Sequence, residues 1–357
     1  MVSFFLSTIK LKLWTFFRLE GGARNPRPCP PAKGRTVHQP RSGATPLPEG
    51  KRQIVLIGNP NVGKSVVFSR LTGRYTTISN YPGTTVEIAS GTYQGDRGKV
   101  VLDTPGINSL IPHSDDERVT RDILLEGGER VVIQVADAKN LRRALTISSQ
   151  LSEMEVPFVL DVNMTDEAQQ KGIDLDVERL SQRLGVPVVE TVAVKNRGIS
   201  RLREALDQAG PSSFRVHYDA DIELAVAGVE SLLPSLPIGR RGAALLALSG
   251  DEGFLSWLSP RMTSQSYQAL ENIRGELQSR RVEPLGYLIS QQRAQAADGV
   301  LREVGSAGRE GGVSVADLLG RLSMHPWVGL PILLVVLFLI YELVGVFGAG
   351  TVVDFVE

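Results

Sequence analysis

The sequence predicts an α/β fold in which helices cover both faces of a mostly parallel sheet, followed by an all-α domain and one C-terminal transmembrane helix. Short apolar runs alternate with helix-length segments between about residues 51 and 207, which is the order of a parallel sheet joined by helical crossovers. Beyond residue 211 apolar positions recur with the helical period. Residues 328–350 are almost wholly apolar, and Glu342 is their one charged residue.

Residues 1–50 are expected to be a basic, proline-rich extension without a fold of its own. Residues 1–52 hold ten Lys and Arg against Glu20 and Glu49, and seven prolines fall within 25–50. Such a composition cannot bury a core, so disorder is expected. Residues 1–19 place apolar side chains around Lys10 and Lys12, which fits either association with a membrane surface or an error in the assigned start, and we assign them no function.

The overall composition excludes several classes of protein. The chain has 39 Lys and Arg against 39 Asp and Glu, so no overall field favours nucleic acid as a partner. Cys29 is the only cysteine, which excludes an internal disulfide and a cysteine-based metal site. At 357 residues the chain is too long for one ordinary domain, because single cores rarely grow past roughly 250 to 300 residues.

The domain limits follow from these patterns. Residues 51–209 are predicted as the α/β domain, with strands at 54–57, 100–102, 131–136, 158–162 and 186–189, and helices at 65–71, 118–125, 141–151, 177–184 and 199–206. Residues 210–304 are predicted as the helical domain, with helices at 222–233, 243–248, 267–277 and 288–304, and residues 305–324 as a flexible linker. Residues 325–357 would hold the membrane helix, whose 23 residues from 328 to 350 are long enough to cross a bilayer core.

A complete GxxxxGK[ST] motif follows the first predicted strand and precedes a helix. Its residues are Gly58, Asn59, Pro60, Asn61, Val62, Gly63, Lys64 and Ser65. The glycines let the backbone curl, so that amide groups and the helix N-terminus face phosphate oxygens. We expect Lys64 to bind the outer phosphates and the Ser65 hydroxyl to bind Mg²⁺. The alternative, a chance match in a glycine-rich turn, is disfavoured by the flanking strand and helix.

A second motif, Asp103-Thr104-Pro105-Gly106, follows the next strong apolar strand and is interpreted as switch II. Asp103 is expected to bind Mg²⁺ through water, and the Gly106 amide to meet the γ-phosphate. The same four residues also make an ordinary turn, so the motif gains weight from its place in the order. Ile107 stands where many GTPases carry a glutamine that orients the attacking water, and because isoleucine cannot do so, slow hydrolysis is expected.

Between these motifs lies the region expected to sense the γ-phosphate, switch I. Its residues are Gly83, Thr84, Thr85, Val86 and Glu87. Thr85 is expected to complete the Mg²⁺ shell. Thr84 in that role, or a threonine that only ends a strand, is the alternative.

The sequence Asn163-Met164-Thr165-Asp166 closes another predicted strand and matches the NxxD pattern that reads guanine. The Asp166 carboxylate can accept hydrogen bonds from the guanine ring N–H and its exocyclic amine, whereas adenine presents an acceptor there. A helix cap of the same sequence is the alternative. The backbone near Ala193, after the last predicted strand, is a weaker candidate to contact the base. The ordered motifs together predict a P-loop GTPase that binds GTP and GDP with Mg²⁺.

In this order, and followed by a helical domain and HPWVGLPILL, the segments GNPNVGKS, YPGTTVE, DTPGINSL and NMTD resemble the ferrous-iron transport protein B family. The likeness runs from about residue 52 to the C-terminus. It implies a cytosolic GTPase domain and helical domain attached to a multi-span permease in the inner membrane, and a small cytosolic accessory protein as a partner. It also implies that Asn61 binds K⁺ in place of an arginine finger; otherwise that amide only stabilises a turn.

Two departures from the family pattern limit what the resemblance implies. The third motif of the family usually reads Asp-Leu-Pro-Gly-Thr-Tyr-Ser-Leu, so Thr104, Ile107 and Asn108 indicate a divergent branch and leave the transported metal open. The sequence given holds one apolar span, and a single helix cannot enclose a polar path for an ion. We therefore expect the permease to be missing or encoded separately.

The leading hypothesis is the GTP-hydrolysing part, with the first membrane helix, of a transporter that couples nucleotide state to Fe²⁺ uptake. A membrane-tethered regulatory GTPase that moves no ion is the alternative. A ribosome-assembly GTPase shares the first motifs, but it needs a basic RNA-binding C-terminal domain, which the apolar tail is not.

Overall fold

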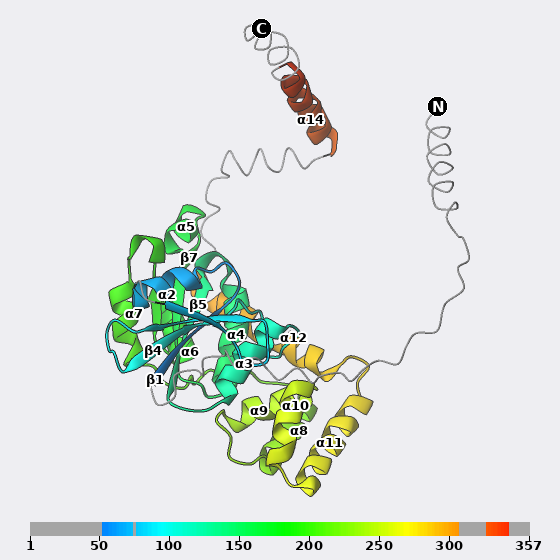
Figure 1. Ribbon diagram of the computed structural model, residues 1–357. Coiled ribbons are helices and arrows are strands. Elements are labelled where there is room, and N and C mark those ends of the chain that lie inside the picture. The colour runs from blue at the N-terminus through cyan, green and yellow to red at the C-terminus, as the bar shows by residue number, and fades with distance from the viewer. Residues whose placement is uncertain (1–51, 74–75, 307–325, 343–357) are drawn as a thin grey trace, which may run out of the picture. The chain divides into compact units, whose positions relative to one another are not determined.

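A computed structural model describes residues 52–73, 76–306 and 326–342 of the chain (Figure 1). The predictions made for residues 1–50, 307–324 and 343–357 lie outside the described residues. The remaining expectations concern the α/β domain, the helical domain and the beginning of the apolar tail.

A seven-stranded sheet forms the centre of the first domain. Its spatial order is β2 (Thr76–Asn80), β3 (Glu87–Thr92), β4 (Lys99–Asp103), β1 (Arg52–Gly58), β5 (Arg130–Asp137), β6 (Phe158–Asn163) and β8 (Val188–Glu190). Strands β4, β1, β5, β6 and β8 run parallel, whereas β3 pairs antiparallel with both β2 and β4. The predicted mostly parallel sheet is confirmed.

Helices cover both faces of this sheet, as predicted. On one side lie α2 (Lys64–Thr72) and α7 (Ile199–Leu206), and on the other α3 (Asp115–Leu125), α4 (Leu141–Glu153) and α6 (Val177–Leu184) (Figure 1). The connections include η1 (Ala138–Asn140), α5 (Thr165–Gln170) and η2 (Ala193–Lys195). Alternate strand residues enter two separate cores, because successive side chains of a strand point to opposite faces.

The β2–β3 hairpin was not among the predicted strands. β2 reads TTISN and is exposed except for the half-buried Ser79, so an edge strand of this kind leaves no apolar run in the sequence. β8 begins two residues later than the strand predicted at 186–189. Helix α3 begins three residues earlier than predicted, because the Ser114 side chain accepts a hydrogen bond from the Glu117 amide and caps it.

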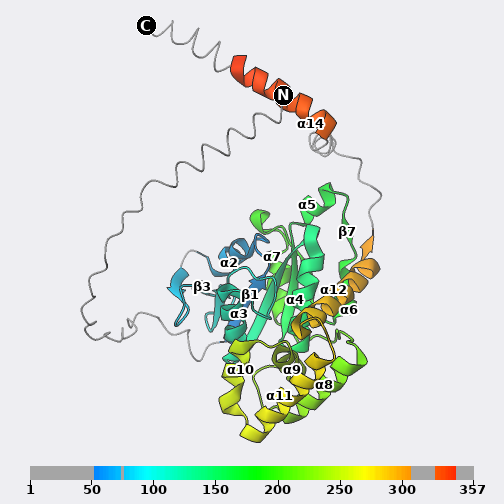
Figure 2. The same cartoon turned by 90° about the vertical axis from the view of Figure 1, so that its right-hand side faces the viewer.

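The helical region contains one more α-helix than predicted, and a short 3-10 helix follows it. Its elements are α8 (Ala220–Leu232), α9 (Arg240–Leu248), α10 (Glu252–Leu258), η3 (Ser259–Arg261), α11 (Ser264–Ser279) and α12 (Leu285–Val304). The unpredicted helix, α10, has only seven residues. Helix α12 runs beside α4 and α6 (Figure 2).

The chain after α12 begins with a short strand at the start of the predicted linker. Gly305 and Ser306 form β9, which pairs antiparallel with β7 (Asp174–Leu175). The first two residues of the predicted linker 305–324 are therefore paired with the first domain, and the linker itself stays a prediction.

The apolar tail contributes α14 (Pro326–Ile340). Within the described ranges, we find no helix with the length and apolar character that a membrane crossing requires. The predicted span at 328–350 extends past residue 342, the last described residue of this segment.

Candidate nucleotide-binding site

The candidate site begins with the loop between β1 and α2. Asn61 and Gly63 adopt left-handed backbone angles, with φ of 64° and 91°. Only glycine fits at position 63, because a Cβ atom there would lie 2.5 Å from Nδ2 of Asn163. Lys64 is 8% exposed, and its Nζ donates to the carbonyl oxygens of Gly58 at 3.3 Å and Asn59 at 3.5 Å. The lysine head is therefore held inside the curl of the loop.

Asp103 and Ser65 offer adjacent oxygen donors beside this loop. Burial raises the pKa of the Asp103 carboxyl group, while the Ser65 hydroxyl and the Lys64 ammonium act in the opposite direction. Among the described residues, the buried Oδ1 atom of Asp103 has no hydrogen-bond partner. Mg²⁺ prefers hard oxygen ligands of this kind. The orphaned carboxylate oxygen next to a hydroxyl fits a magnesium site.

Switch II packs directly against the phosphate loop. A Cβ atom on Gly106 would lie 2.8 Å from Cα of Pro60, and the Ile107 amide donates to the Gly58 carbonyl at 3.0 Å. The buried Asn59 side chain donates to the Ile107 carbonyl at 3.1 Å and to Oδ1 of Asn108 at 3.3 Å. Asn59, which was predicted to bind phosphate, therefore uses its side chain to join the loop to the residues directly after switch II.

The segment after switch II is fixed by two side chains from helices. Glu117 of α3 accepts from the amides of Asn108 at 3.1 Å and His113 at 2.8 Å. Gln150 of α4 accepts from the Leu110 amide at 2.8 Å and donates to the Ser109 hydroxyl at 2.9 Å. These four bonds tie residues 108–113 to α3 and α4.

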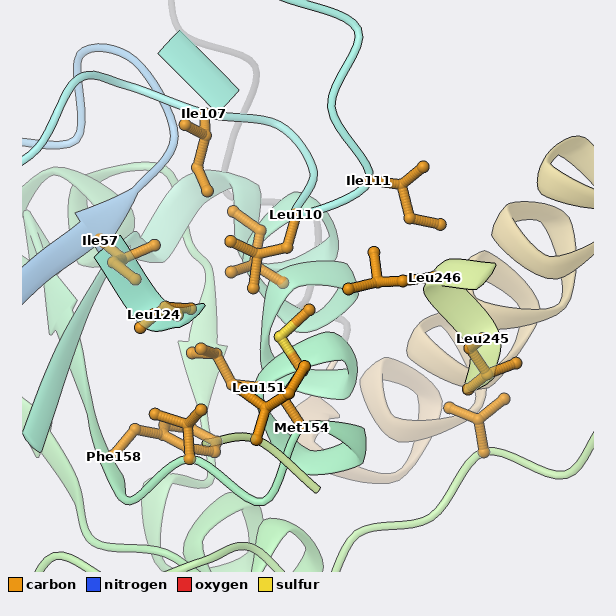
Figure 3. Close-up of a cluster of buried hydrophobic side chains, with 14 of the residues drawn as sticks. Ile57, Ile107, Leu110, Ile111, Leu124, Leu151, Met154, Phe158, Leu245 and Leu246 are labelled. Carbon is orange, nitrogen blue, oxygen red and sulfur yellow. The ribbon is translucent and has the colours of Figure 1, made fainter. Parts of the chain in front are cut away.

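The apolar side chains of the same segment enter the core. Ile107 and Leu110 are fully buried, so Ile107 cannot reach an attacking water. Leu110 and Ile111 lie close to Leu246 of α9, a helix of the second domain (Figure 3). Switch II is thus continuous with a core that the two domains share.

Switch I distinguishes its two threonines. The Thr84 hydroxyl donates to the Tyr81 carbonyl at 3.1 Å and accepts from the Val86 amide at 3.2 Å, so it is used within the turn. Thr85 is exposed, and its hydroxyl makes no hydrogen bond to the described part of the chain. This difference favours Thr85 over Thr84 as the metal ligand, which stays a prediction, as does a role for Gly83 and Glu87.

Asn163 connects the phosphate loop to the segment that follows β8. Its Nδ2 donates to the Val62 carbonyl at 2.9 Å, and its Oδ1 accepts from the Ala193 amide at 3.0 Å and from Oγ1 of Thr191 at 3.1 Å. The structure therefore brings the predicted residues Asn163 and Ala193 together. The Ala193 amide, which was predicted to contact the base, is used by Asn163.

Asp166 follows at the start of α5. Its Oδ2 accepts from Nζ of Lys195 at 2.7 Å, and its Oδ1 accepts from the Glu167 amide at 3.0 Å. The Lys195 hydrogen bond is the main cause that lowers the pKa of Asp166. The carboxylate is thus an acceptor, as reading guanine requires. Met164 takes a left-handed φ of 63° before α5, and the Thr165 hydroxyl donates to the Thr191 carbonyl at 3.3 Å.

Three residues of the site were missed by sequence reasoning. They are Lys195, Arg70 and the side chain of Thr191, whose backbone alone was expected near the base. The guanidinium group of Arg70 donates to the carbonyls of Ala193 at 3.0 Å and Val194 at 2.7 Å. Arg70 lies 123 positions before Ala193, and no sequence pattern links the two.

Comparison with protein families matches residues 52–206 to ferrous iron transport protein B and residues 218–306 to the FeoB cytosolic helical domain. The Fe(2+) transporter FeoB of Escherichia coli K12 is 31% identical over 302 residues, which cover 82% of this chain and 38% of that protein. A fusion of Fe(2+) transport protein A with Fe(2+) transporter FeoB from Porphyromonas gingivalis is 31% identical, covering 83% of this chain and 37% of the fusion. The chain thus spans under two fifths of the length of these relatives.

Solved structures of similar sequence have the same fold. A GDP-bound mutant G domain of FeoB from S. thermophilus superposes with a TM-score of 0.65 at 30% identity, covering 71% of this chain and 100% of that one. NFeoB from the same organism, bound to GDP.AlF4⁻ and K⁺, gives a TM-score of 0.61 at 29% identity, covering 70% and 99%. The predicted P-loop GTPase fold and the helical domain after it are confirmed.

Proposed function

Because the chain belongs to the ferrous iron transport protein B family, we propose that its G domain, residues 51–209, binds and hydrolyses GTP as the cytosolic part of a ferrous-iron transporter. The observation that carries this proposal is the 2.9 Å hydrogen bond from Nδ2 of Asn163 to the Val62 carbonyl. It fixes the phosphate loop relative to Asp166, three residues after Asn163. A single nucleotide needs its phosphates and its base held at such a fixed separation.

The phosphates would be bound by the backbone amides and the lysine of the phosphate loop, which the fold already brings together. The buried ammonium of Lys64 lies in the loop of amides from Gly58 to Gly63 and would bind the outer phosphates. Mg²⁺ would be held by Ser65 and Thr85, with Asp103 acting through water, and would neutralise phosphate charge when bound. The buried, unpartnered Oδ1 of Asp103 supports that assignment among the described residues.

The base end would select guanine through Asp166. Its lowered pKa keeps the carboxylate ionised, so it can accept from the ring N–H and the exocyclic amine of guanine. Adenine would place an acceptor against this charge. A preference for GTP over ATP follows.

Hydrolysis is proposed to be slow in itself and faster with K⁺. The Ile107 side chain is fully buried and cannot orient water. Asn61 is exposed at the outer side of the phosphate loop, where its amide oxygen could bind a cation. A cation there would supply the charge that an arginine finger provides in other GTPases, and the similar S. thermophilus protein was crystallised with K⁺ and GDP.AlF4⁻.

Nucleotide state is proposed to reach the helical domain through α3. Glu117 accepts hydrogen bonds from the backbone amides at positions 108 and 113, the two ends of the segment after switch II. Arg121, one turn further along α3, forms an ion pair with Asp251. The Arg121 and Asp251 side chains are only 2% and 4% exposed. Asp251 also accepts from the Phe254 amide and so caps α10. A shift of switch II would therefore act on the first turn of α10.

The helical domain, residues 210–304, would pass this change to a permease in the inner membrane. Residues 305–324 would link it to the first membrane helix within 325–357, with both folded domains on the cytoplasmic side. The partners would be the remaining permease, in the same or another chain, and a small accessory protein, consistent with the Porphyromonas gingivalis fusion. No nucleic acid partner is proposed.

The test is GTP hydrolysis by the full chain in Mg²⁺ with either K⁺ or Na⁺. We expect faster hydrolysis in K⁺, equal rates in the two salts for Asn61→Ala, and more than about 100-fold weaker binding for Lys64→Ala. Asn272→Ala, an exposed asparagine on α11, is the matched control and should behave as wild type. Equal rates in both salts for wild type would end the K⁺ role, and full binding by Lys64→Ala would end the nucleotide assignment.

A further inference from the structure

A buried carboxyl group lies beside the nucleotide site without a role in the proposed chemistry. Asp161 stands in the middle of β6 and is 0% exposed. Its Oδ1 accepts from Oγ1 of Thr191 at 2.6 Å, whereas its Oδ2 is buried and makes no hydrogen bond to the described residues. A lone acidic residue in the otherwise apolar run 158–162 was the sequence signal that could have pointed to it.

Thr191 is shared between two acceptors. Its hydroxyl lies 2.6 Å from Oδ1 of Asp161 and 3.1 Å from Oδ1 of Asn163. A threonine hydroxyl carries a single proton, so it can donate fully to only one of them. Asp161 and Asn163 therefore compete for the same donor.

This competition affects the whole site, because the Asn163 side chain connects the phosphate loop to the segment after β8. Its amide group holds the Val62 carbonyl of the phosphate loop, and its carbonyl oxygen holds the Ala193 amide. A second donor on that oxygen would fix the side chain more firmly.

We propose that Asp161 is a positioning residue whose protonation, relayed through Thr191 to Asn163, sets the affinity of the site for guanine nucleotide. This inference rests on the proposed function of the site. When Asp161 is protonated, its O–H donates to Oγ1 of Thr191. The Thr191 hydroxyl then donates its own hydrogen bond to Oδ1 of Asn163. When Asp161 is ionised, Thr191 donates to the carboxylate, and Asn163 keeps only the Ala193 amide.

The surroundings place this change near neutral pH. Burial raises the pKa of Asp161 to about 7, and the Thr191 hydrogen bond opposes the rise. Its register neighbours are apolar, Val135 on β5 and Val189 on β8. The charged residues on the neighbouring strands and on the helices of this face are Lys64 and Arg70 of α2, Arg130 and Asp137 of β5, Glu190 of β8, Lys195 of η2, and Arg201, Arg203 and Glu204 of α7.

None of these charged groups is directed at Asp161. Lys64 and Arg70 donate to loop carbonyls, and Arg203 donates to the Arg70 carbonyl. Lys195 donates to Asp166, Arg130 donates to Gln53, and Asp137 accepts from the Lys139 amide. Glu190, Arg201 and Glu204 are exposed. The protonation of Asp161 is therefore governed by burial and by Thr191.

The experiment measures the affinity of the full chain for GDP in Mg²⁺ at several values between about pH 5.5 and 8.5, a range centred on the raised pKa of Asp161. Wild type should bind about two- to tenfold more tightly at the acid end, the effect of one hydrogen bond. Asp161→Asn, whose amide can always donate to Thr191, should bind tightly at every pH. Thr191→Val should bind weakly at every pH, and Thr191→Ser should restore the wild-type profile.

Glu190→Gln is the matched control, because Glu190 is an exposed acid next to Thr191 that takes no part in the relay. It should keep the wild-type profile. Because the phosphates of GDP also titrate, a pH dependence of wild type alone does not identify Asp161. The comparison of wild type with the variants does. If Asp161→Asn or Thr191→Val keeps the wild-type pH dependence, or if wild type has none, the relay is wrong. If wild type binds no GDP at any pH, the proposed function itself fails.

Discussion

The two faces of the central sheet differ in what covers them. On the α2 and α7 side, the core consists of residues of the first domain alone, from Ile54 to Ala209. On the α3, α4 and α6 side, one continuous core runs from Val55 to Val304 and includes all the main helices of the second domain. The first face supports the loops proposed to bind the phosphates and the base, whereas the second embeds the segment that begins with switch II in a core shared by both domains.

This difference indicates which parts of the site can move independently. Asn163, Arg70 and Thr191 connect loops within one face, so they would fix a nucleotide bound as proposed relative to the sheet. Ile107, Leu110 and Ile111 pack into the shared core, so a shift of switch II must displace side chains that also contact the helical domain. Nucleotide binding and interdomain coupling are thus separable by mutation.

The largest expected effect is a loss of stability caused by a substitution in the core that the two domains share. Arg293 of α12 donates to Oε2 of Glu153 at 2.9 and 2.7 Å, and their side chains are 3% and 1% exposed. Arg293→Met would leave Glu153 buried without its cation, which should lower the free energy of unfolding by about 3 to 5 kcal/mol in urea titrations. The affinity for GDP of the protein that stays folded should change less than about twofold.

The double variant Arg293→Met with Glu153→Leu is the control for that experiment. Removing both charges should restore much of the lost stability, because no unpaired charge remains. A loss below about 1 kcal/mol in the single variant would mean that this ion pair is solvated and that the shared face is not held as described.

A somewhat smaller effect concerns Asp161 on the other face of the sheet, which should make the stability of the protein depend on pH. The folded-state pKa of Asp161, about 7, lies above its ordinary value of 3.8, so the folded chain binds the proton more tightly than the unfolded chain. Protonation of Asp161 therefore adds most to the free energy of unfolding below about pH 4, and this contribution is lost as the pH rises to about 7. Between about pH 5.5 and 7.5 the loss should be about 2 kcal/mol.

Asp161→Asn removes the titrating group and should flatten that part of the stability profile. Urea unfolding of both proteins at the two pH values measures the difference. An equal slope in wild type and Asp161→Asn would show that other groups cause it.

The smallest expected effect tests how the base-reading segment is fixed. Arg70→Met removes the donors to the Ala193 and Val194 carbonyls, which are partly exposed to solvent, so GDP should bind about fivefold more weakly, or about 1 kcal/mol. Arg201→Met, an exposed arginine on α7, should bind as wild type. Unchanged affinity in Arg70→Met would mean that Asn163 and the other contacts of the segment hold it without Arg70.

The parts of the fold that could be predicted from sequence are those with a strong local signal. The apolar runs of β1, β4, β5 and β6 identified buried strands, and the motifs at their ends placed Lys64, Asp103 and Asn163 at one edge of the sheet. The β2–β3 hairpin carries no such run, since its outer strand is exposed. The short helix α10 has too few residues for a clear helical period.

The site was predictable in its motif residues and not in the contacts between them. Nothing in the spacing indicates that Asn59 binds switch II or that Asn163 binds Val62, because each bond depends on the tertiary arrangement of loops. Arg70 and Lys195 lie outside any motif, and only the folded chain brings them and the Thr191 side chain to the site.

Nucleotide selectivity at Asp166 tests the central claim most directly. The affinities of GTP, ATP and xanthosine triphosphate are measured in Mg²⁺ for the full chain and for Asp166→Asn. Wild type should prefer GTP over ATP by about 100-fold or more, and Asp166→Asn should prefer xanthosine triphosphate, whose C2 carbonyl oxygen can accept from the new amide. Equal binding of GTP and ATP by wild type would contradict a guanine-reading carboxylate at this position.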